Sequence, residues 1–158
     1  MLAPTVRDPS LHTVKFTDAR NLSPLFDEAV RDEQPVMIVR SNRERGVLMS
    51  REAMRRVLAP FRLHVDVLPE DEGGFTLWLR ELNVGGSGQT LEAAREDLLS
   101  AVRSYVRDYR EQFGFYRHLT DMAAQEPYVL RLSLALDDGE LIALLFGAPS
   151  DSTPASAT

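Results

Sequence analysis

The chain has 158 residues, a net charge of −6 at pH 7, and 44% hydrophobic and 27% charged residues. These values predict a globular chain of one typical domain or two small ones, with enough apolar material for a core. The sequence has no apolar run of about eighteen residues and no hydrophobic signal core in Met1–Ser10, which argues against a membrane span and a secretory signal. The absence of cysteine excludes a disulfide scaffold and a thiolate metal site, and favours a cytoplasmic location.

The charge is unevenly distributed along the chain. Residues 1–60 contain ten basic and eight acidic residues, whereas residues 61–158 contain eight basic and sixteen acidic residues. A basic front half is suited to phosphate, and an acidic second half is suited to a basic protein partner. Two ordinary solvated surfaces would give the same pattern, so charge alone does not decide between these interpretations.

The first third of the chain predicts a short extended segment from Val14, followed by a helical turn that Thr17 caps. Ser23 as a cap and Pro24 at the first helical position then predict a helix that ends before Pro35. Its apolar face has the i, i+3, i+4 spacing of a helix and comprises Leu22, Leu25, Phe26, Ala29 and Val30.

Two short apolar segments, residues 36–39 and 47–49, flank a polar stretch and predict a β-hairpin. Ser50 is the predicted cap of a helix that runs to about Ala59, where Pro60 stops it. The order predicted for residues 14–59 is therefore a helical turn, a capped helix, a hairpin and a second capped helix.

The second part of the chain predicts two strands, at residues 61–67 and 75–80, because apolar and polar residues alternate in both. The acidic, glycine-containing turn at residues 69–74 joins them. Residues 83–89 are glycine-rich and predict a loop or a poor edge strand. Thr90 then caps a long helix that ends near Phe113 and whose core stripe includes Leu91, Ala94, Leu98, Val102, Tyr105 or Ala101, and Tyr109.

The last part of the chain predicts a short helix from Phe115 to about Gln125. Tyr128–Leu136 and Leu141–Phe146, with Asp137–Gly139 between them, predict a final β-hairpin that is apolar on both faces. Residues 148–158 have little to bury and are predicted to be a disordered tail.

Three motifs in residues 14–59 resemble the N-terminal domain of the Phd/YefM antitoxins. They occur in the family order as TDARNLS at residues 17–23, PVMIVR at residues 35–40 and VLMSRE at residues 47–52. The resemblance implies a domain that dimerises and binds palindromic operator DNA beside its own gene. Arg20 and Arg40 match the arginines that would contact the operator. Asn21, which follows Arg20, is a further candidate DNA contact.

The tip of the predicted hairpin departs from the Phd/YefM pattern, because residues 42–45 replace the usual glycine. Whether Arg43 or Arg45 reaches DNA is therefore left open, and both are kept as candidates. The alternative to DNA binding for Arg20 is a structural role, in an ion pair with Asp18 or Glu28 of the same chain. The position of Arg20 near a helix start favours an external anion such as phosphate.

Residues 61 to about 112 resemble the HicB antitoxin domain, a degraded RNase H-like fold. The resemblance rests on EDEGGF at residues 70–75 and on TLEAA at residues 90–94, which opens the helix. It departs from the family at residues 83–86, which stand where the usual Pro-Gly-Cys is expected. The resemblance implies a toxin-binding domain, with Glu70, Asp71, Trp78 and Arg80 as the candidate toxin contacts.

Catalysis is not predicted. An RNase H-type nuclease needs several carboxylates around two metal ions. Here Asp66 lies on the first strand, while the acidic residues 70–72 lie in a turn and the second strand has none. The chain lacks a Gly-x-Ser-x-Gly motif, and residues 85–88 lack the lysine of a phosphate-binding loop. No catalytic residue, metal site or cofactor is therefore predicted.

Trp78 lies on the opposite strand face from Phe75, Leu77 and Leu79. It either packs beneath the predicted final hairpin or forms an exposed anchor for a partner, and the sequence favours neither.

The sequence therefore predicts an α+β chain with four parts. These are an N-terminal arm (1–13), a Phd/YefM-like helix–hairpin–helix domain for DNA binding and dimerisation (14–60), a HicB-like antiparallel sheet packed on a long helix (61–147) and the tail (148–158). The expected protein is a homodimeric, non-enzymatic cytoplasmic antitoxin, with higher oligomers on DNA and without membrane contact. It would neutralise a small toxin, a ribonuclease, and repress its own operon.

Two other functions stay open. One is a stand-alone repressor without a toxin, in which the second domain serves dimerisation or ligand sensing. The other is a metal-dependent nuclease that depends on Asp66.

Overall fold

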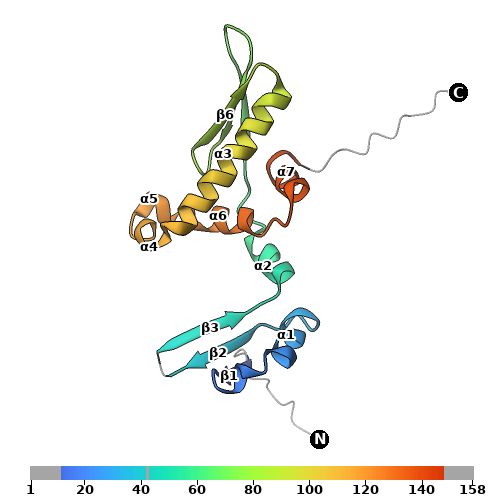
Figure 1. Cartoon of the computed structure of the whole chain (residues 1–158), viewed down its shortest axis with the longest axis vertical. Helices are drawn as coiled ribbons and strands as arrows, with labels where there is room; N and C mark the ends of the chain where they lie inside the picture. Colours follow the sequence, from blue (N-terminus) through green and yellow to red (C-terminus); the bar gives the residue numbers. More distant parts are fainter. Residues whose placement is uncertain (1–11, 42, 148–158) are drawn as a thin grey trace, which may run out of the picture. The chain divides into compact units, whose positions relative to one another are not determined.

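The computed structural model describes residues 12–41 and 43–147 (Figure 1). Most of the predicted arm, the predicted tail and Asn42 lie outside these residues. Contacts divide the chain into two compact units, with the boundary after Val57. Both units combine a three-stranded sheet with helices. The predicted α+β class is confirmed.

Unit 1 contains a mixed sheet in the order β1-β2-β3, formed by β1 (His12–Lys15), β2 (Val36–Arg40) and β3 (Glu44–Leu48). Strands β2 and β3 form the predicted hairpin, and the extended start is β1, which pairs with β2 in parallel. The turn η1 (Asp18–Arg20) and helix α1 (Leu22–Val30) connect the parallel strands. Helix α2 (Arg51–Leu58) follows β3 and runs across the boundary between the units.

Helix α1 begins two residues earlier than predicted, at Leu22. Ser23 is therefore in its first turn, and Asn21 occupies the cap position without a side-chain capping bond. Pro24 fits within the first turn, because the first amides of a helix have no acceptor in the helix. Thr17 precedes η1, but its hydroxyl also makes no capping bond, so these two predicted caps are wrong.

Unit 2 contains an antiparallel sheet in the order β4-β5-β6, formed by β4 (Val65–Pro69), β5 (Phe75–Leu79) and β6 (Val84–Gly88). The long helix α3 (Leu91–Glu111) packs along one face of this sheet (Figure 1). Leu77 and Leu79 of β5 are fully buried beneath it, with Ala94, Leu98, Val102 and Tyr109 of the predicted helix stripe. Residues 84–88 form an edge strand, which is the second of the two predicted alternatives.

The glycines of β6 explain why a segment with weak strand propensity is held so closely against α3. A Cβ on Gly86 would lie 2.2 Å from the amide nitrogen of Leu98, and one on Gly88 would lie 2.6 Å from that of Ala94. Both distances are shorter than van der Waals contact, so only glycine permits this packing. The glycine-rich composition serves helix–sheet packing.

The predicted final hairpin is wrong, because both of its segments are helices. Helix α6 (Glu126–Ser133) buries Val129 and Leu132, and α7 (Asp138–Phe146) buries Leu141 and Leu145. These i, i+3 and i, i+4 pairs fit a helix, and leucine is a strong helix former. Asp137 does not form a strand turn but caps α7, accepting a hydrogen bond of 2.9 Å from the amide of Glu140.

The single helix predicted for residues 115–125 is also wrong. The segment forms two short helices, α4 (Phe113–Tyr116) and α5 (Thr120–Ala123), with a break at Leu119. The Tyr109 hydroxyl donates a hydrogen bond of 2.5 Å to the backbone carbonyl of Met122, which ties this connection to α3. Burial raises the pKa of Tyr109, so the phenol stays protonated as the donor.

Two of the predicted caps are confirmed and give a stability prediction. The side chains of Ser50 and Thr90 accept hydrogen bonds from the amides of Ala53 and Ala93, at 3.0 and 3.1 Å. Ser50→Ala and Thr90→Ala should each lower the free energy of unfolding by about 1 kcal/mol. Thermal unfolding followed by circular dichroism measures this loss, and Thr17→Ala is the matched control. Equal effects of all three substitutions would contradict the capping assignment.

Candidate interaction surfaces

Arg40 ends β2 and faces Glu44, its register partner at the start of β3. The Nε of Arg40 lies 2.5 Å from Oε2 of Glu44, and the guanidinium lies 5.5 Å from the centre of the Phe16 ring. Both charged side chains are more than half exposed, so the pair contributes little to stability. The ring and the carboxylate instead hold the guanidinium at the turn end of the hairpin.

The predicted DNA-contacting arginines of the hairpin do not share one face. Val39 in the central strand β2 pairs with Arg45 of β3 on one side and with Lys15 of β1 on the other. Because side chains alternate between the faces of a sheet, Lys15 and Arg45 lie on one face while Arg40 lies on the other. Arg43 is exposed at the tip, between the two faces.

Arg20 ends η1, and Asn21 separates it from α1. Both are exposed. Arg20 forms no ion pair with another described residue, so the intramolecular pair with Asp18 or Glu28 that the sequence left open is not seen there. Its guanidinium is available to an external anion.

The face of the unit 2 sheet opposite to α3, here called the outer face, carries two cross-strand rows. The register aligns Asp66, Trp78 and Gly85 in one row, and Leu68, Thr76 and Ser87 in the next. Trp78 is 36% exposed and Leu68 is 50% exposed. A Cβ on Gly85 would lie 2.7 Å from the Trp78 ring, so the glycine provides the space in which the ring lies across the sheet. Since the final hairpin does not exist, Trp78 cannot pack beneath it.

Arg80 follows β5 and makes a two-pronged ion pair with Asp66 on the outer face. Its Nε lies 2.5 Å from Oδ2 of Asp66, and a second nitrogen contacts the other carboxylate oxygen. The hydrogen bond from Arg80 lowers the pKa of Asp66, and the same bond raises the pKa of Arg80. The pair therefore stays ionised to a lower pH than an isolated aspartate would allow, and it loses its contribution as the pH falls through the lowered pKa of Asp66.

The turn between β4 and β5 carries the acidic candidates. Glu70 accepts a hydrogen bond from the Thr76 hydroxyl, which connects the turn to the outer face. Asp71 and Glu72 are exposed and form no ion pair within the described residues. Trp78, Arg80, Glu70 and Asp71 thus lie on or beside one surface.

Sequence reasoning missed three residues at these surfaces. Leu68 belongs to the outer face, and the alternation of β4 with Asp66 already contained that signal. Phe16 and Lys15 belong to unit 1, but their positions depend on the parallel pairing of β1, which no local pattern indicates.

The nuclease hypothesis gains no support from the geometry. Asp66 is engaged by Arg80, and residues 12–41 and 43–147 contain no group of three or more potential metal-ligating His, Asp or Glu side chains. Nor does any helix in these ranges have the length and apolarity needed to cross a membrane.

Comparisons with known proteins identify the family. The chain is similar to a crystal structure from Syntrophomonas wolfei subsp. wolfei, described as the antitoxin part of a proposed toxin/antitoxin system. The match has a TM-score of 0.73 and 23% sequence identity, and covers 86% of this chain and 97% of that one, which shows a shared fold. No curated protein matches the chain. A family model described as PHD-like, antitoxin of toxin–antitoxin, RelE/RelB, matches residues 10–147. The chain therefore belongs to this PHD-like family of antitoxins.

Proposed function

We propose that this antitoxin neutralises a small protein toxin by binding it through the outer face of unit 2, and represses its own operon by binding operator DNA through unit 1. The observation that carries the toxin-binding part is the outer face itself. There an exposed tryptophan and leucine lie beside an acidic turn, on the side of the sheet that α3 leaves open. Family membership supports a regulatory protein rather than an enzyme.

The chemistry of the outer face defines the partner. Asp66 neutralises Arg80, so the net charge of this surface comes from Glu70, Asp71 and Glu72. A basic partner with an apolar contact fits such a surface, because opposite charges accelerate association and a buried aromatic anchor slows dissociation. A ribonuclease toxin has this chemistry, since its RNA-binding groove is positively charged. The HicB-like resemblance of residues 61–112 points to the same role.

The DNA-binding part rests on the exposed arginines of unit 1 and on the Phd/YefM resemblance. Arg20, Arg43 and Arg45 are without an acidic partner among the described residues, and Arg40 is held at the hairpin end. Guanidinium groups of this kind bind phosphate and guanine edges. Two copies of unit 1 would bind the two halves of a palindromic operator, with Asn21 beside Arg20 as a further contact.

Isolation of the tagged chain from its native cells tests the toxin-binding part. A small basic protein that co-purifies in stoichiometric amount, and is identified by mass spectrometry, is the expected result. Recovery of the folded chain alone would remove toxin neutralisation. The stand-alone repressor would then be the better interpretation.

Operator binding gives a separate prediction. Arg20→Ala and Arg40→Ala should each weaken binding roughly tenfold, because a hydrogen bond to a charged group contributes about 1.5 kcal/mol. Each should also reduce the slope of log affinity against log salt by about one. Fluorescence anisotropy with the DNA upstream of the gene, at several salt concentrations, measures both quantities.

Arg31→Ala is the matched control for operator binding. Arg31 is exposed and lies at the far end of α1 from Arg20, where it pairs with Asp27 at 3.4 Å. Its loss should leave affinity and salt slope unchanged. Unchanged values for both Arg20→Ala and Arg40→Ala would overturn the assignment of these two residues to the operator.

A further inference from the structure

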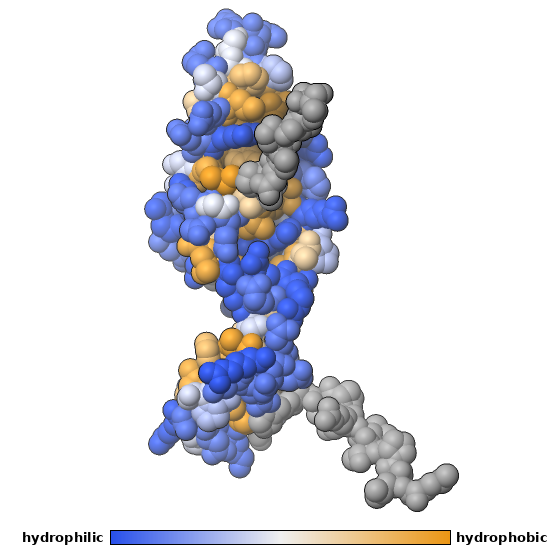
Figure 2. Space-filling view, turned by 90° about the vertical axis from the view of Figure 1, so that its right-hand side faces the viewer, coloured by the Kyte–Doolittle hydropathy of each residue, from blue (hydrophilic) through white to orange (hydrophobic). Residues whose placement is uncertain are grey.

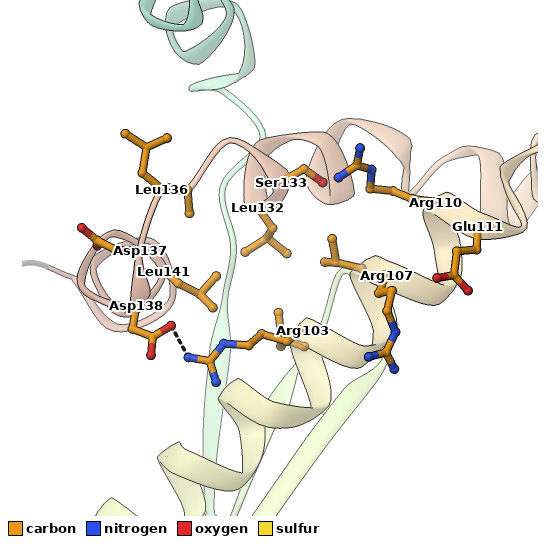
Figure 3. Close-up of a pocket in the computed structure, with 13 residues that line it drawn as sticks. Arg103, Arg107, Arg110, Glu111, Leu132, Ser133, Leu136, Asp137, Asp138 and Leu141 are labelled. Atoms are coloured by element: carbon orange, nitrogen blue, oxygen red, sulfur yellow. Dashed lines mark ion pairs between the residues drawn. The ribbon is translucent and has the colours of Figure 1, made fainter.

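A groove on unit 2 lies between α3, α6 and α7 and has a volume of about 620 Å³ (Figure 3). Three arginines and three carboxylates line it, and Arg103 is paired with Asp138, as the dashed line in Figure 3 shows. The side of unit 2 on which α7 lies faces the viewer in Figure 2, where apolar patches interrupt the hydrophilic surface. Because its charges balance, the groove favours neither an acidic nor a basic partner.

Strand β4 is an edge of the unit 2 sheet, because the order β4-β5-β6 leaves it with a neighbour on one side only. Two backbone hydrogen bonds of 3.1 Å frame its pairing with β5. The amide of Arg80 donates to the carbonyl of His64, and the amide of Glu70 donates to the carbonyl of Gly74. Hydrogen-bonded pairs of an antiparallel ladder recur at every second residue. The even-numbered residues of β4 therefore bind β5, and the odd-numbered residues direct their amide and carbonyl groups to the open edge.

The open edge of β4 is formed by the backbone of Val65, Val67 and Pro69, and no described residue accepts a hydrogen bond from the two valine amides. Pro69 has no amide, and proline in a sheet is typical of an edge position of this kind. The two valines lie opposite the buried Leu79 and Leu77, so their side chains are on the α3 side of the sheet. Helix α3 packs mainly over β5 and β6, and Val67 remains 51% exposed. The edge is thus open to a further strand.

The other edge of the sheet, β6, is closed by α3. The odd-numbered residues of β5 bind β6, and the register then directs the backbone of Gly85 and Ser87 outward. The carboxylate of Asp97 on α3 accepts a hydrogen bond of 2.8 Å from the amide of Ser87. The glycines of β6 also offer no side chain against which an added strand could pack. With one open and one closed edge, two such sheets join as a closed pair and not as a fibre.

We propose that the β4 strands of two copies of the chain pair in antiparallel orientation and join the two unit 2 sheets into one sheet of six strands. An antiparallel copy of a strand presents the same alternation of donors and acceptors, so the edge is complementary to itself. Charge does not oppose the approach, because Asp66 is the one charged residue of β4 and is already paired with Arg80. The α3-side valines of the two copies then pack against each other.

This contact is separate from the two activities proposed above. The toxin would bind the outer face, whereas edge pairing uses backbone groups and side chains on the α3 side of the sheet. Operator binding uses unit 1. Loss of the edge contact should therefore leave both toxin binding and operator binding in place.

Amide hydrogen exchange of the full chain, followed by NMR at high protein concentration, tests the pairing at single residues. Asp66 and Leu68 donate to β5, so their amides should be protected whether or not two copies pair. Val65 and Val67 should be protected as well, because their amides then bond across the edge. Fast exchange of Val65 and Val67 beside protected Asp66 and Leu68 would overturn the proposal.

Substitution of Val67 separates edge pairing from the fold of the sheet. Val67→Pro removes an outward amide and leaves the ladder with β5 intact, so Val65 should exchange at least about tenfold faster. Val67→Lys places a charge beside the edge and should have the same effect without changing the backbone. Val67→Thr is the matched control, because it keeps both the amide and the β-branched shape. Equal exchange of Val65 in all four chains would contradict the pairing.

Mixed isotope labels identify the occupant of the edge. In an equal mixture of ¹⁵N-labelled and ¹³C-labelled chains, nuclear Overhauser effects should connect the amide protons of Val65 and Val67 to carbon-bound protons of β4 in the other chain. Protected amides without these contacts would show that a different segment or protein covers the edge, and would overturn the proposal.

Discussion

Gly86→Ala should destabilise unit 2 by more than about 3 kcal/mol, the upper part of the range for overpacked sites. The added methyl group would lie 2.2 Å from the nitrogen and 2.5 Å from the Cα of Leu98, and 2.8 Å from the backbone carbonyl carbon of Asp97. These are backbone atoms in the middle of α3, so no side-chain rotation relieves the overlap. The helix must move away from β6, and the burial of Leu77 and Leu98 between sheet and helix is then lost.

Denaturant unfolding followed by the fluorescence of Trp78 measures this effect, because Trp78 is the only tryptophan and lies in the same sheet. Gly114→Ala is the matched control in the same unit. A Cβ there meets no atom within 4 Å, and Gly114 lies within a helix, so the substitution should be neutral or stabilise by up to about 1 kcal/mol. A midpoint for Gly86→Ala equal to that of the unaltered chain would show that α3 does not pack on β6 as described.

Local signals in the sequence correctly predicted those elements whose residue pattern fits only a strand or only a helix. The alternation in residues 75–79 placed Leu77 and Leu79 in the core, and the caps Ser50 and Thr90 fixed two helix starts. The prediction of a final hairpin was wrong because a leucine-rich run of eight residues fits both the two-residue period of a strand and the 3.6-residue period of a helix. The choice between them depends on α3, against which Val129 and Leu132 pack, and no local pattern contains that contact.

Some features of the candidate surfaces could likewise be predicted from local sequence patterns, whereas others depend on tertiary contacts. The outer position of Trp78 follows from strand alternation, and the structure agrees. Neutralisation of Arg80 by Asp66 depends on strand register, which the turn and the neighbouring strand determine together. The arginine-lined groove depends on α6 and α7 being helices, so an incorrect hairpin prediction concealed it.

Trp78→Ala should weaken toxin binding by about 2 kcal/mol or more, which is roughly a 30-fold increase in Kd. The ring is the largest apolar group on the outer face, and it lies between the Asp66–Arg80 pair and the space above Gly85. A partner that covers the ring removes it from water, and the surrounding charged residues then exclude solvent from the contact. Binding of the co-purified partner, measured by titration calorimetry, gives the change in Kd.

Two control substitutions separate the contact from the fold. Trp78→Phe retains an aromatic anchor and should restore much of the affinity, whereas Phe115→Ala removes an exposed ring on α4 and should leave Kd unchanged. Asp71→Asn should act differently, by slowing association and reducing its dependence on salt while leaving dissociation nearly constant. Normal toxin binding by Trp78→Ala would place the toxin elsewhere on the chain, because the outer face has no other aromatic residue to anchor it.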